Sequence, residues 1–283
     1  MIVALLTAEH RLCRLRWAEL NEGNQYYNWV DVDEKWYFAF KLAGRVRYPK
    51  ADFSDIEDFA IEGPYKNLAS KSQIPKVMFL AATARPRREH NFDGLIGMWC
   101  IVQPYEAKKK SKYHEKGDVY DKACTLDSTL YLKMMKEKVF PAVWEKMPWL
   151  RREGFDRVVV QQDGARPHTG KGNVAKLNEF GCSRAKPVGA VVAEVVTQPA
   201  QSYDTNINDL AFFSAHNCRF NKVQKLASVD DLNLLKKNVL DTYWAFPAAT
   251  LEKMWKTKIA ILQLIIACKG GNHYKIGRVS KAA

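Results

Sequence analysis

The sequence has no cysteine pair at the spacing of a zinc site, no internal repeat and no long apolar segment. Its six cysteines are scattered without a CxxC pair or a partnered histidine, which argues against a zinc site and a disulfide framework. A late apolar run, 259–268, is interrupted by Gln263 and is too short to span a bilayer. The apolar first residues lack the basic flank of a secretory signal. We therefore expect a soluble intracellular protein with free thiols and no membrane partner.

Acidic residues are outnumbered by basic ones. The 283 residues include 44 Lys and Arg against 31 Asp and Glu, a formal net charge of +13. Such an excess suggests a polyanionic partner, most commonly nucleic acid, although many basic proteins bind none. Hydrophobic residues make up 47% of the chain and aromatic residues 12%, enough for a sizeable core. The length suits one large domain or two small ones.

The spacing of apolar residues predicts a group of strands followed by alternating helices and strands. Leucines at helical spacing predict an amphipathic helix near the N-terminus, and two later runs join a first strand in an antiparallel meander. A basic loop at 108–117 then leads to a helix. The expected strands are 28–40, 77–83, 94–102, 157–163 and 191–196, and the expected helices are 127–138, 172–180 and most of the chain from about 208. This order predicts a mixed α/β or α+β sheet layered by helices.

Three aspartates stand out by their context. Asp33 lies on the first strand, Asp163 ends the most hydrophobic strand, and Asp209 opens a helix. Phosphoryl transfer with two metal ions needs carboxylates that converge on cations about 3.5–4 Å apart, and such hard cations prefer oxygen ligands. Each aspartate also has an ordinary interpretation: Asp33 as a partner of Lys35, Asp163 as a turn residue before Gly164, and Asp209 as an acid favoured at a helix start.

The segments around these aspartates resemble three motifs of mariner-like DDE transposases, in that family's order. VDVDEKWY at 30–37 resembles the family's DEKW block, and VQQDGARPH at 160–168 resembles its QDNARPH block. QPAQSYDTNINDLAFF at 198–213 resembles the third block, PAQSPDLNxNDLxFF. The strands near 76–82 and 94–99 and the tail at 270–277 are also similar to members of this family. The resemblance therefore covers nearly the whole chain.

The resemblance implies an α/β, ribonuclease H-like fold with a mixed central sheet flanked by helices and a helical C-terminal extension. It divides the chain into a residual linker helix at 1–25, a catalytic domain at 26–218 and the extension at 219–283. The family's N-terminal helix-turn-helix region is missing here. We therefore interpret the chain as a remnant, or a truncated gene product, that retains the catalytic part.

The resemblance also implies the chemistry. Asp33, Asp163 and Asp209 would be the catalytic residues and would hold two Mg²⁺ or Mn²⁺ ions, without a small-molecule cofactor. The protein would cut and rejoin double-stranded DNA in the nucleus, and because family members usually work as dimers, a homodimer is an open expectation. Three close carboxylates without a cation repel one another. We therefore expect Asp163→Asn to leave the metal-free protein at least as stable as the parent.

Some positions depart from the family pattern. The Asn that follows the second aspartate is Gly164 here, and the Pro of the third motif is Tyr203. The connection between Asp163 and Asp209 is longer than in the animal elements. These departures keep a second hypothesis open: a non-catalytic nucleic-acid-binding or interaction protein derived from a decayed transposase.

Several neighbouring residues have two interpretations. Asp204 is an alternative third metal ligand, whereas Glu34 lies on the opposite face of its strand from Asp33 and is expected to be structural. His168 would contact DNA phosphate or hydrogen-bond near the second aspartate, or it would simply order its loop. The basic loop would either grip DNA phosphates or carry solvated charge; its lysines are Lys108, Lys109, Lys110, Lys112 and Lys116.

Overall fold

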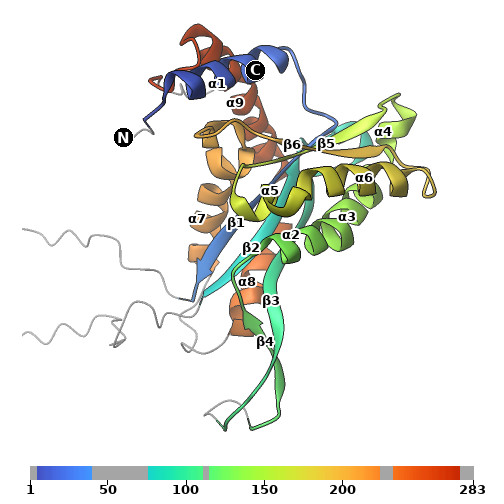
Figure 1. The fold of residues 1–283 in the computed structure, drawn as a ribbon, viewed down its shortest axis with the longest axis vertical. Coiled ribbons are helices and arrows are strands. Elements are labelled where there is room, and N and C mark those ends of the chain that lie inside the picture. Colours follow the sequence, from blue (N-terminus) through green and yellow to red (C-terminus); the bar gives the residue numbers. More distant parts are fainter. Residues whose placement is uncertain (1–4, 40–75, 111–114, 224–231, 275–283) are drawn as a thin grey trace, which may run out of the picture.

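A mixed six-stranded sheet forms the centre of the computed structural model, which describes residues 5–39, 76–110, 115–223 and 232–274 (Figure 1). The strand order is β4-β3-β2-β1-β5-β6. Strands β1 to β4 pair in antiparallel fashion, and β5 and β6 continue the sheet in parallel on the other side of β1. The strands are β1 Trp29–Phe38, β2 Lys76–Ala84, β3 Leu95–Glu106, β4 Val119–Ala123, β5 Arg157–Gln162 and β6 Val192–Thr197.

Helices cover both faces of this sheet (Figure 1). One face packs against α2 Ser128–Met134, α3 Phe140–Lys146, α4 Trp149–Arg152 and α6 Asn173–Ala185, and the other against α1 Ala8–Leu20, α7 Phe213–Val223, α8 Leu232–Trp244 and α9 Ala248–Ala267. The short helix α5 Arg166–Thr169 follows β5, and the π-helical turns η4 Met135–Val139 and η7 Asn208–Phe212 precede α3 and α7. The predicted mixed sheet flanked by helices, with helices at the C-terminus, is confirmed. No helix in the described ranges is both long and apolar enough to cross a membrane.

Strand β1 separates the two cores by simple alternation. Val30 and Val32 belong to the core beneath α2, α3 and α6, whereas Trp29 belongs to the core beneath α7, α8 and α9. Side chains two residues apart on a strand share a face. Asp31 and Asp33 therefore lie on the side of the C-terminal helices, where Asp31 is fully buried and Asp33 is 7% exposed.

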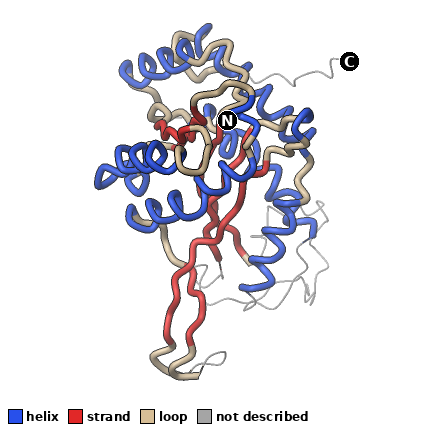
Figure 2. Tube along the Cα trace, turned by 90° about the vertical axis from the view of Figure 1, so that its right-hand side faces the viewer, coloured by secondary structure: helices blue, strands red, loops and turns tan. Residues whose placement is uncertain are grey.

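The sequence prediction missed strand β4. Residues 119–123 pair with the outer half of β3 and form a hairpin arm that projects from the body of the molecule (Figure 2). Most side chains of β4 are exposed on both faces. An exposed two-stranded arm needs no apolar alternation, so the periodicity used to find the other strands is not present here. The described residues of the basic loop, 108–110 and 115–117, lie toward the tip of this arm.

A buried ion pair joins α9 to β1. The ammonium nitrogen of Lys258 lies 2.7 Å from Oδ2 of Asp31 and 3.0 Å from Oε1 of Gln161, and both charged side chains are fully buried. The rings of Tyr26 and Trp255 each lie 4.8 Å from the same nitrogen. Burial lowers the pKa of Lys258 to about 8, against the opposite effect of Asp31. The pair therefore depends on both partners, because neither charge has access to water.

We predict that Lys258→Met lowers the free energy of unfolding by about 3–5 kcal/mol, because it leaves the Asp31 carboxylate buried without its cation. Urea denaturation followed by circular dichroism measures the change. The matched control is Lys256→Met, two residues earlier on the exposed side of α9. Its 3.9 Å pair with Glu252 should contribute less than about 1 kcal/mol. Equal losses in the two variants would show that the buried pair is not a special anchor.

Candidate active site

The parallel pairing of β1 and β5 brings Asp33 and Asp163 together. Asp31 is the register partner of Gln161. Two residues further along both strands, the same register places Asp33 beside Asp163, which directly follows the last residue of β5. Side chains separated by two residues point to the same side of a strand. Two carboxyls from neighbouring strands therefore meet just beyond the carboxyl end of β5.

Asp209 is placed by the turn that precedes it. The backbone N–H of Ile207 donates to Oδ2 of Asp31 at 2.7 Å, and the side-chain amide of Asn208 donates to the Asp31 carbonyl at 2.9 Å. Thr83 in turn donates to the Asn208 side-chain oxygen at 2.9 Å. Asp209 is the second residue of η7, and π-helical turns of this kind occur often at functional sites. These bonds hold the start of η7 against β1 and bring Asp209 toward Asp33.

Asp33 is an unfavourably placed charge. Its Oδ1 accepts a hydrogen bond from the backbone of Glu34 at 2.8 Å, but its buried Oδ2 has no hydrogen-bond donor. Burial raises the pKa of Asp33 well above its ordinary value, and the charges of Asp209, Glu34 and Asp163 raise it further. Partial burial, and to a smaller extent the charge of Asp163, also raises the pKa of Asp209, while a hydrogen bond with Asp33 and the charge of Lys35 oppose this rise. Asp209 is exposed at the surface, so water screens its share of the repulsion.

Asp163 differs because His168 compensates its charge. His168 is 2% exposed; its Nδ1 donates to Oδ1 of Asp163, and its Nε2 lies 2.8 Å from Oε1 of Glu34. Although burial opposes ionisation of Asp163, the bond to His168 and its charge hold the pKa of Asp163 below its ordinary value. The two carboxylates likewise outweigh burial and raise the pKa of His168 to about 10. His168 is therefore a cation between two anions.

This arrangement alters two expectations. Since the ionised form of Asp163 is favoured in the folded protein, Asp163→Asn removes a favourable interaction, and this argues against the expectation that the metal-free variant is at least as stable as the parent. The charge that destabilises the site is that of Asp33. Both ring nitrogens of His168 also face carboxylates, so neither is left to contact a DNA phosphate.

Sequence reasoning treated Glu34 as a structural residue on the far face of β1. The structure places it on that face, but His168 connects it to Asp163 at the carboxyl end of β5. The sequence signal for this contact is the position of His168, which lies in the short helix α5, five residues after Asp163. Asp31 and Lys258 were also missed, because nothing in the sequence identifies two residues so far apart as partners.

Asp204 is committed to a different interaction. The guanidinium of Arg14 in α1 donates to Oδ1 and to Oδ2 of Asp204, at 2.7 Å in both cases, and the hydroxyl of Tyr274 contacts Oδ2. Arg14 is 1% exposed and also donates to the carbonyl oxygen of Gly270 at 3.1 Å. Asp204 therefore fastens α1 and the chain near Tyr274 to the loop before Asp209. The geometry favours Asp209 over Asp204 beside the other two aspartates.

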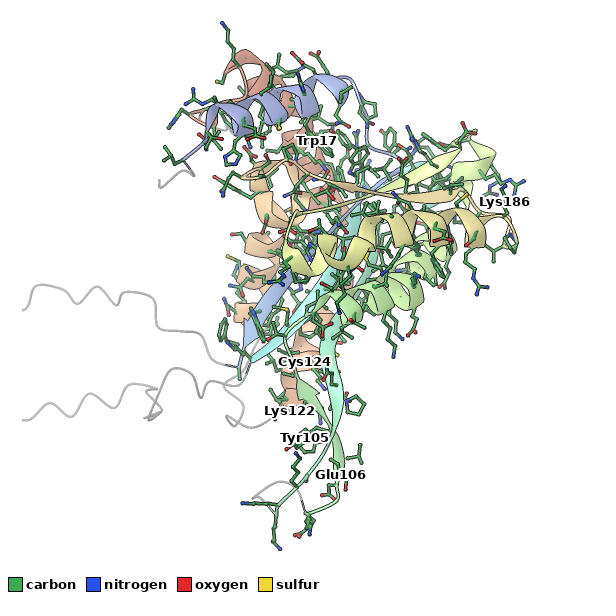
Figure 3. The ribbon with its side chains drawn as sticks, in the orientation of Figure 1. Trp17, Tyr105, Glu106, Lys122, Cys124 and Lys186 are labelled. Carbon is green, nitrogen blue, oxygen red and sulfur yellow. The ribbon has the colours of Figure 1, made fainter. Side chains whose placement is uncertain are left out.

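The predicted lysines lie on the hairpin arm, away from the aspartates. Lys108, Lys109, Lys110 and Lys116 are exposed near its tip, and Lys112 lies outside the described residues. Lys110 forms an exposed 2.7 Å pair with Glu115. Figure 3 shows Tyr105 and Lys122 further along the same arm, where the Lys122 ammonium lies 4.3 Å from the Tyr105 ring centre.

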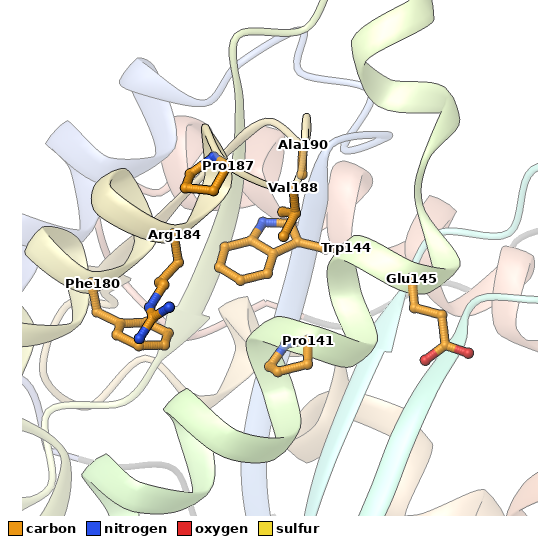
Figure 4. Close-up of a pocket in the computed structure, with 8 residues that line it drawn as sticks. All are labelled: Pro141, Trp144, Glu145, Phe180, Arg184, Pro187, Val188 and Ala190. Carbon is orange, nitrogen blue, oxygen red and sulfur yellow. The ribbon is translucent and has the colours of Figure 1, made fainter.

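A separate pocket lies at the other end of the parallel strands. This open pocket of about 520 Å³ is lined mainly by apolar and aromatic side chains, among them Trp144, Phe180 and Val188 (Figure 4). It adjoins the amino end of β6, whereas Asp163 follows the carboxyl end of the parallel strand β5. The pocket therefore does not belong to the carboxylate site.

The carboxylate site is suited in chemistry and charge to divalent cations. Its donors are carboxylate oxygens, the ligands that Mg²⁺ and Mn²⁺ prefer. Oδ2 of Asp33 is buried without a hydrogen-bond donor, and the neighbouring carboxylates add to burial in raising the pKa of Asp33. Within the described ranges, however, no group of three His, Cys, Asp or Glu side chains is already placed to hold a metal ion. A cation would have to draw the side chains together, which its charge favours.

Solved structures of the Mos1 mariner transposase share this architecture. The chain aligns over 97% of its length with the Mos1 mariner paired end complex with Mn, at 16% identity and a TM-score of 0.63, and with the Mos1 catalytic domain at 14% identity and 0.59. The Mos1 strand transfer complex aligns over 97% of this chain at 14% identity and 0.60. The fold is that of the mariner transposase catalytic domain. The predicted ribonuclease H-like fold and the resemblance to mariner-like transposases are thus confirmed in the architecture.

The share of the Mos1 chain that aligns with this protein differs between the solved structures. It covers 100% of the Mos1 catalytic domain but 66% of the Mos1 chain in the paired end and strand transfer complexes. No protein-family model and no curated protein sequence matches the chain.

We predict that Asp33→Asn stabilises the metal-free protein increasingly as pH rises. The folded-state pKa of Asp33 lies above its ordinary value of 3.8, so the folded protein binds this proton more tightly, and the parent loses stability as pH rises from about 4 through the folded pKa. The stability gained by the variant should therefore be more than about 1 kcal/mol larger at pH 8 than at pH 4. Urea unfolding in EDTA measures it, with Asp156→Asn, an exposed aspartate at the opposite end of β5, as the control. A gain that does not depend on pH would contradict the assigned burial and repulsion.

Proposed function

We propose that this chain is the catalytic part of a mariner-like transposase, a DNA endonuclease and strand transferase that uses two divalent metal ions. The proposal is carried by two features: Asp33, Asp163 and Asp209, from three separate motifs, lie near enough for their charges to act on one another, and the buried Oδ2 of Asp33 has no hydrogen-bond partner. The fold shared with the Mos1 catalytic domain supports it, as do the Mos1 structures that contain Mn or Mg.

The three aspartates would hold the metal ions from different elements of the fold. Asp33, fixed on β1, and Asp163, fixed at the end of β5, would hold the ions from the sheet, and Asp209 would close the site from η7. Bound divalent ions supply Lewis-acid stabilisation of the phosphate and a nucleophilic oxygen at neutral pH. In cleavage, water attacks phosphorus and one P–O bond of the DNA breaks; in joining, a DNA 3′-hydroxyl attacks and another P–O bond breaks. The three side chains orient these groups in line.

We further propose that the substrate is double-stranded DNA, that the protein acts as a homodimer and that it works in the nucleus. The net charge of +13 and the exposed lysines of the hairpin arm support a DNA partner. The similar Mos1 structures include a paired-end complex with the left transposon end and a strand transfer complex.

One observation favours the second hypothesis, a DNA-binding protein that has lost catalysis. The backbone at Gly164 does not require glycine, since a Cβ there would meet only a methyl group of Thr197, at 3.7 Å. The asparagine of the family motif would therefore fit, and its amide is missing beside Asp163. The loss of this group is expected to weaken cleavage, while DNA binding by the basic surface would remain.

Nicking of supercoiled plasmid in Mn²⁺ tests the proposal. We expect the parent and Asp156→Asn to nick the plasmid, and Asp163→Asn to lose at least about 100-fold in rate, because loss of an essential carboxylate removes several kcal/mol of transition-state stabilisation. Mn²⁺ should also raise the melting temperature of the parent more than that of Asp163→Asn. DNA binding without nicking or Mn²⁺-dependent stabilisation would instead establish the decayed, non-catalytic protein.

The hairpin arm makes a separate prediction about DNA affinity. Replacing Lys108, Lys109 and Lys110 with Gln should weaken DNA binding at every sequence and reduce the slope of log K against log salt by up to about 2.7, since each phosphate contact contributes about 0.9. Fluorescence anisotropy over a salt series measures it. The control replaces three exposed lysines elsewhere, Lys186, Lys253 and Lys256, with the same change in net charge. If both triple variants lose the same affinity, the arm has no specific part in binding.

A further inference from the structure

The metal-binding role proposed for the three aspartates does not explain why a buried His168 bridges Asp163 and Glu34. His168 lies between Asp163 and Glu34 with both ring nitrogens engaged, and its side chain is 2% exposed. The side chain of Glu34 is 13% exposed and comes from the face of β1 opposite to Asp33. A buried bridge that reaches a predicted metal ligand from the far face of the sheet requires a reason beyond core packing.

The bridge uses one oxygen of Asp163 and leaves the other. Oδ1 accepts from Nδ1 of His168 and from the backbone N–H of Ala165, the latter at 2.9 Å. Within the described part of the chain no hydrogen bond or ion pair involves Oδ2, and 36% of the Asp163 side chain remains exposed. Asp163 follows the end of β5, where the backbone alone does not fix the rotation of the carboxylate. With both donors on Oδ1, rotation of the carboxylate is restricted, and Oδ2 is the oxygen left available to a ligand.

His168 is itself firmly held. Glu34 accepts from its Nε2 with both oxygens, at 2.8 and 3.1 Å. The Tyr131 ring lies 4.3 Å from the imidazole ring centre, and the Tyr131 hydroxyl donates to Oε1 of Gln162 at 2.6 Å. The ring is therefore fixed by β1, α2 and the residue that precedes Asp163. A ligand supported in this way loses little freedom when a metal ion binds.

We propose that Glu34 and His168 are positioning residues that hold Asp163 with Oδ1 occupied and Oδ2 presented to a divalent metal ion. The inference rests on the proposed function, since it assigns Asp163 to the metal site. It adds that metal affinity depends on a histidine and a glutamate that do not touch the metal. Partners of this kind change metal affinity by about 10–100-fold when they are replaced in other proteins.

Two amide substitutions separate positioning from stability. In His168→Asn the amide nitrogen takes the place of Nδ1, so the donor to Asp163 is kept and the contact with Glu34 is lost. In His168→Gln the longer amide takes the place of Nε2, so the contact with Glu34 is kept and the donor to Asp163 is lost. Both variants remove the same ring and the same charge, and we expect similar free energies of unfolding without metal.

The measurement is the dissociation constant for Mn²⁺ on the full chain without DNA, by isothermal titration calorimetry, beside urea unfolding in EDTA. We expect His168→Gln to bind Mn²⁺ about 10–100-fold more weakly than the parent, and His168→Asn to stay within a few-fold of it. Glu34→Gln, which keeps the shape of the bridge and loses one charge, should weaken Mn²⁺ binding by an intermediate factor. Glu34→Gln carries the test if a His168 variant does not fold.

The outcomes distinguish this inference from the proposed function. If the parent binds Mn²⁺ and nicks DNA while the folded variants bind Mn²⁺ as tightly, the positioning role is wrong and the proposed function stands. If His168→Asn and His168→Gln lose affinity equally, the hydrogen bond to Oδ1 of Asp163 is not what determines Mn²⁺ affinity, and the inference is again overturned. If the folded parent binds no Mn²⁺, both the proposed function and the positioning role fail.

Discussion

The arrangement of this protein depends on the buried carboxylate of Asp31. It accepts hydrogen bonds from the ammonium of Lys258 in α9 and from the backbone N–H of Ile207 in the turn before η7. One side chain thereby fixes a C-terminal helix and the start of the segment that carries Asp209 to the same point on β1. A buried charge is tolerated only when it is fully paired and hydrogen-bonded. This requirement makes the attachment specific, because any shift of α9 or η7 would leave Asp31 or Lys258 unpaired.

From that point, strand geometry brings the site together. Asp33 lies two residues beyond Asp31 and therefore on the same face, and the parallel register with β5 places Asp163 next to it. The same attachment of η7 supplies Asp209. Two aspartates at neighbouring positions on the same face of one strand thus have opposite electrostatic environments. Asp31 has its countercharge within the protein, whereas Asp33 has an oxygen without any donor.

Asp33 and Asp163 are also held in place in different ways. Asp33 is held by the rigid backbone of a central strand and by burial, while Asp163 follows a strand end and is oriented by His168. A rigid backbone position needs no further support, but a ligand on a turn does. Glu34, on the opposite face of β1, does not lie beside Asp33 but is connected to Asp163 through His168.

The sequence by itself determined the elements with strong periodicity and the three motifs. The apolar runs of β1, β2, β3, β5 and β6 and the long helices were predicted because burial imposes a period of 2 or 3.6 residues. Asp33, Asp163 and Asp209 were selected through local motifs, and the alternation of β1 placed Asp31 on the same face as Asp33. Only the tertiary structure decided their partners: Lys258 for Asp31, Arg14 for Asp204 and His168 for Asp163. Ion pairs between distant segments leave no periodic signal, and an exposed arm such as β4 needs none, so neither is encoded in the local pattern of residues.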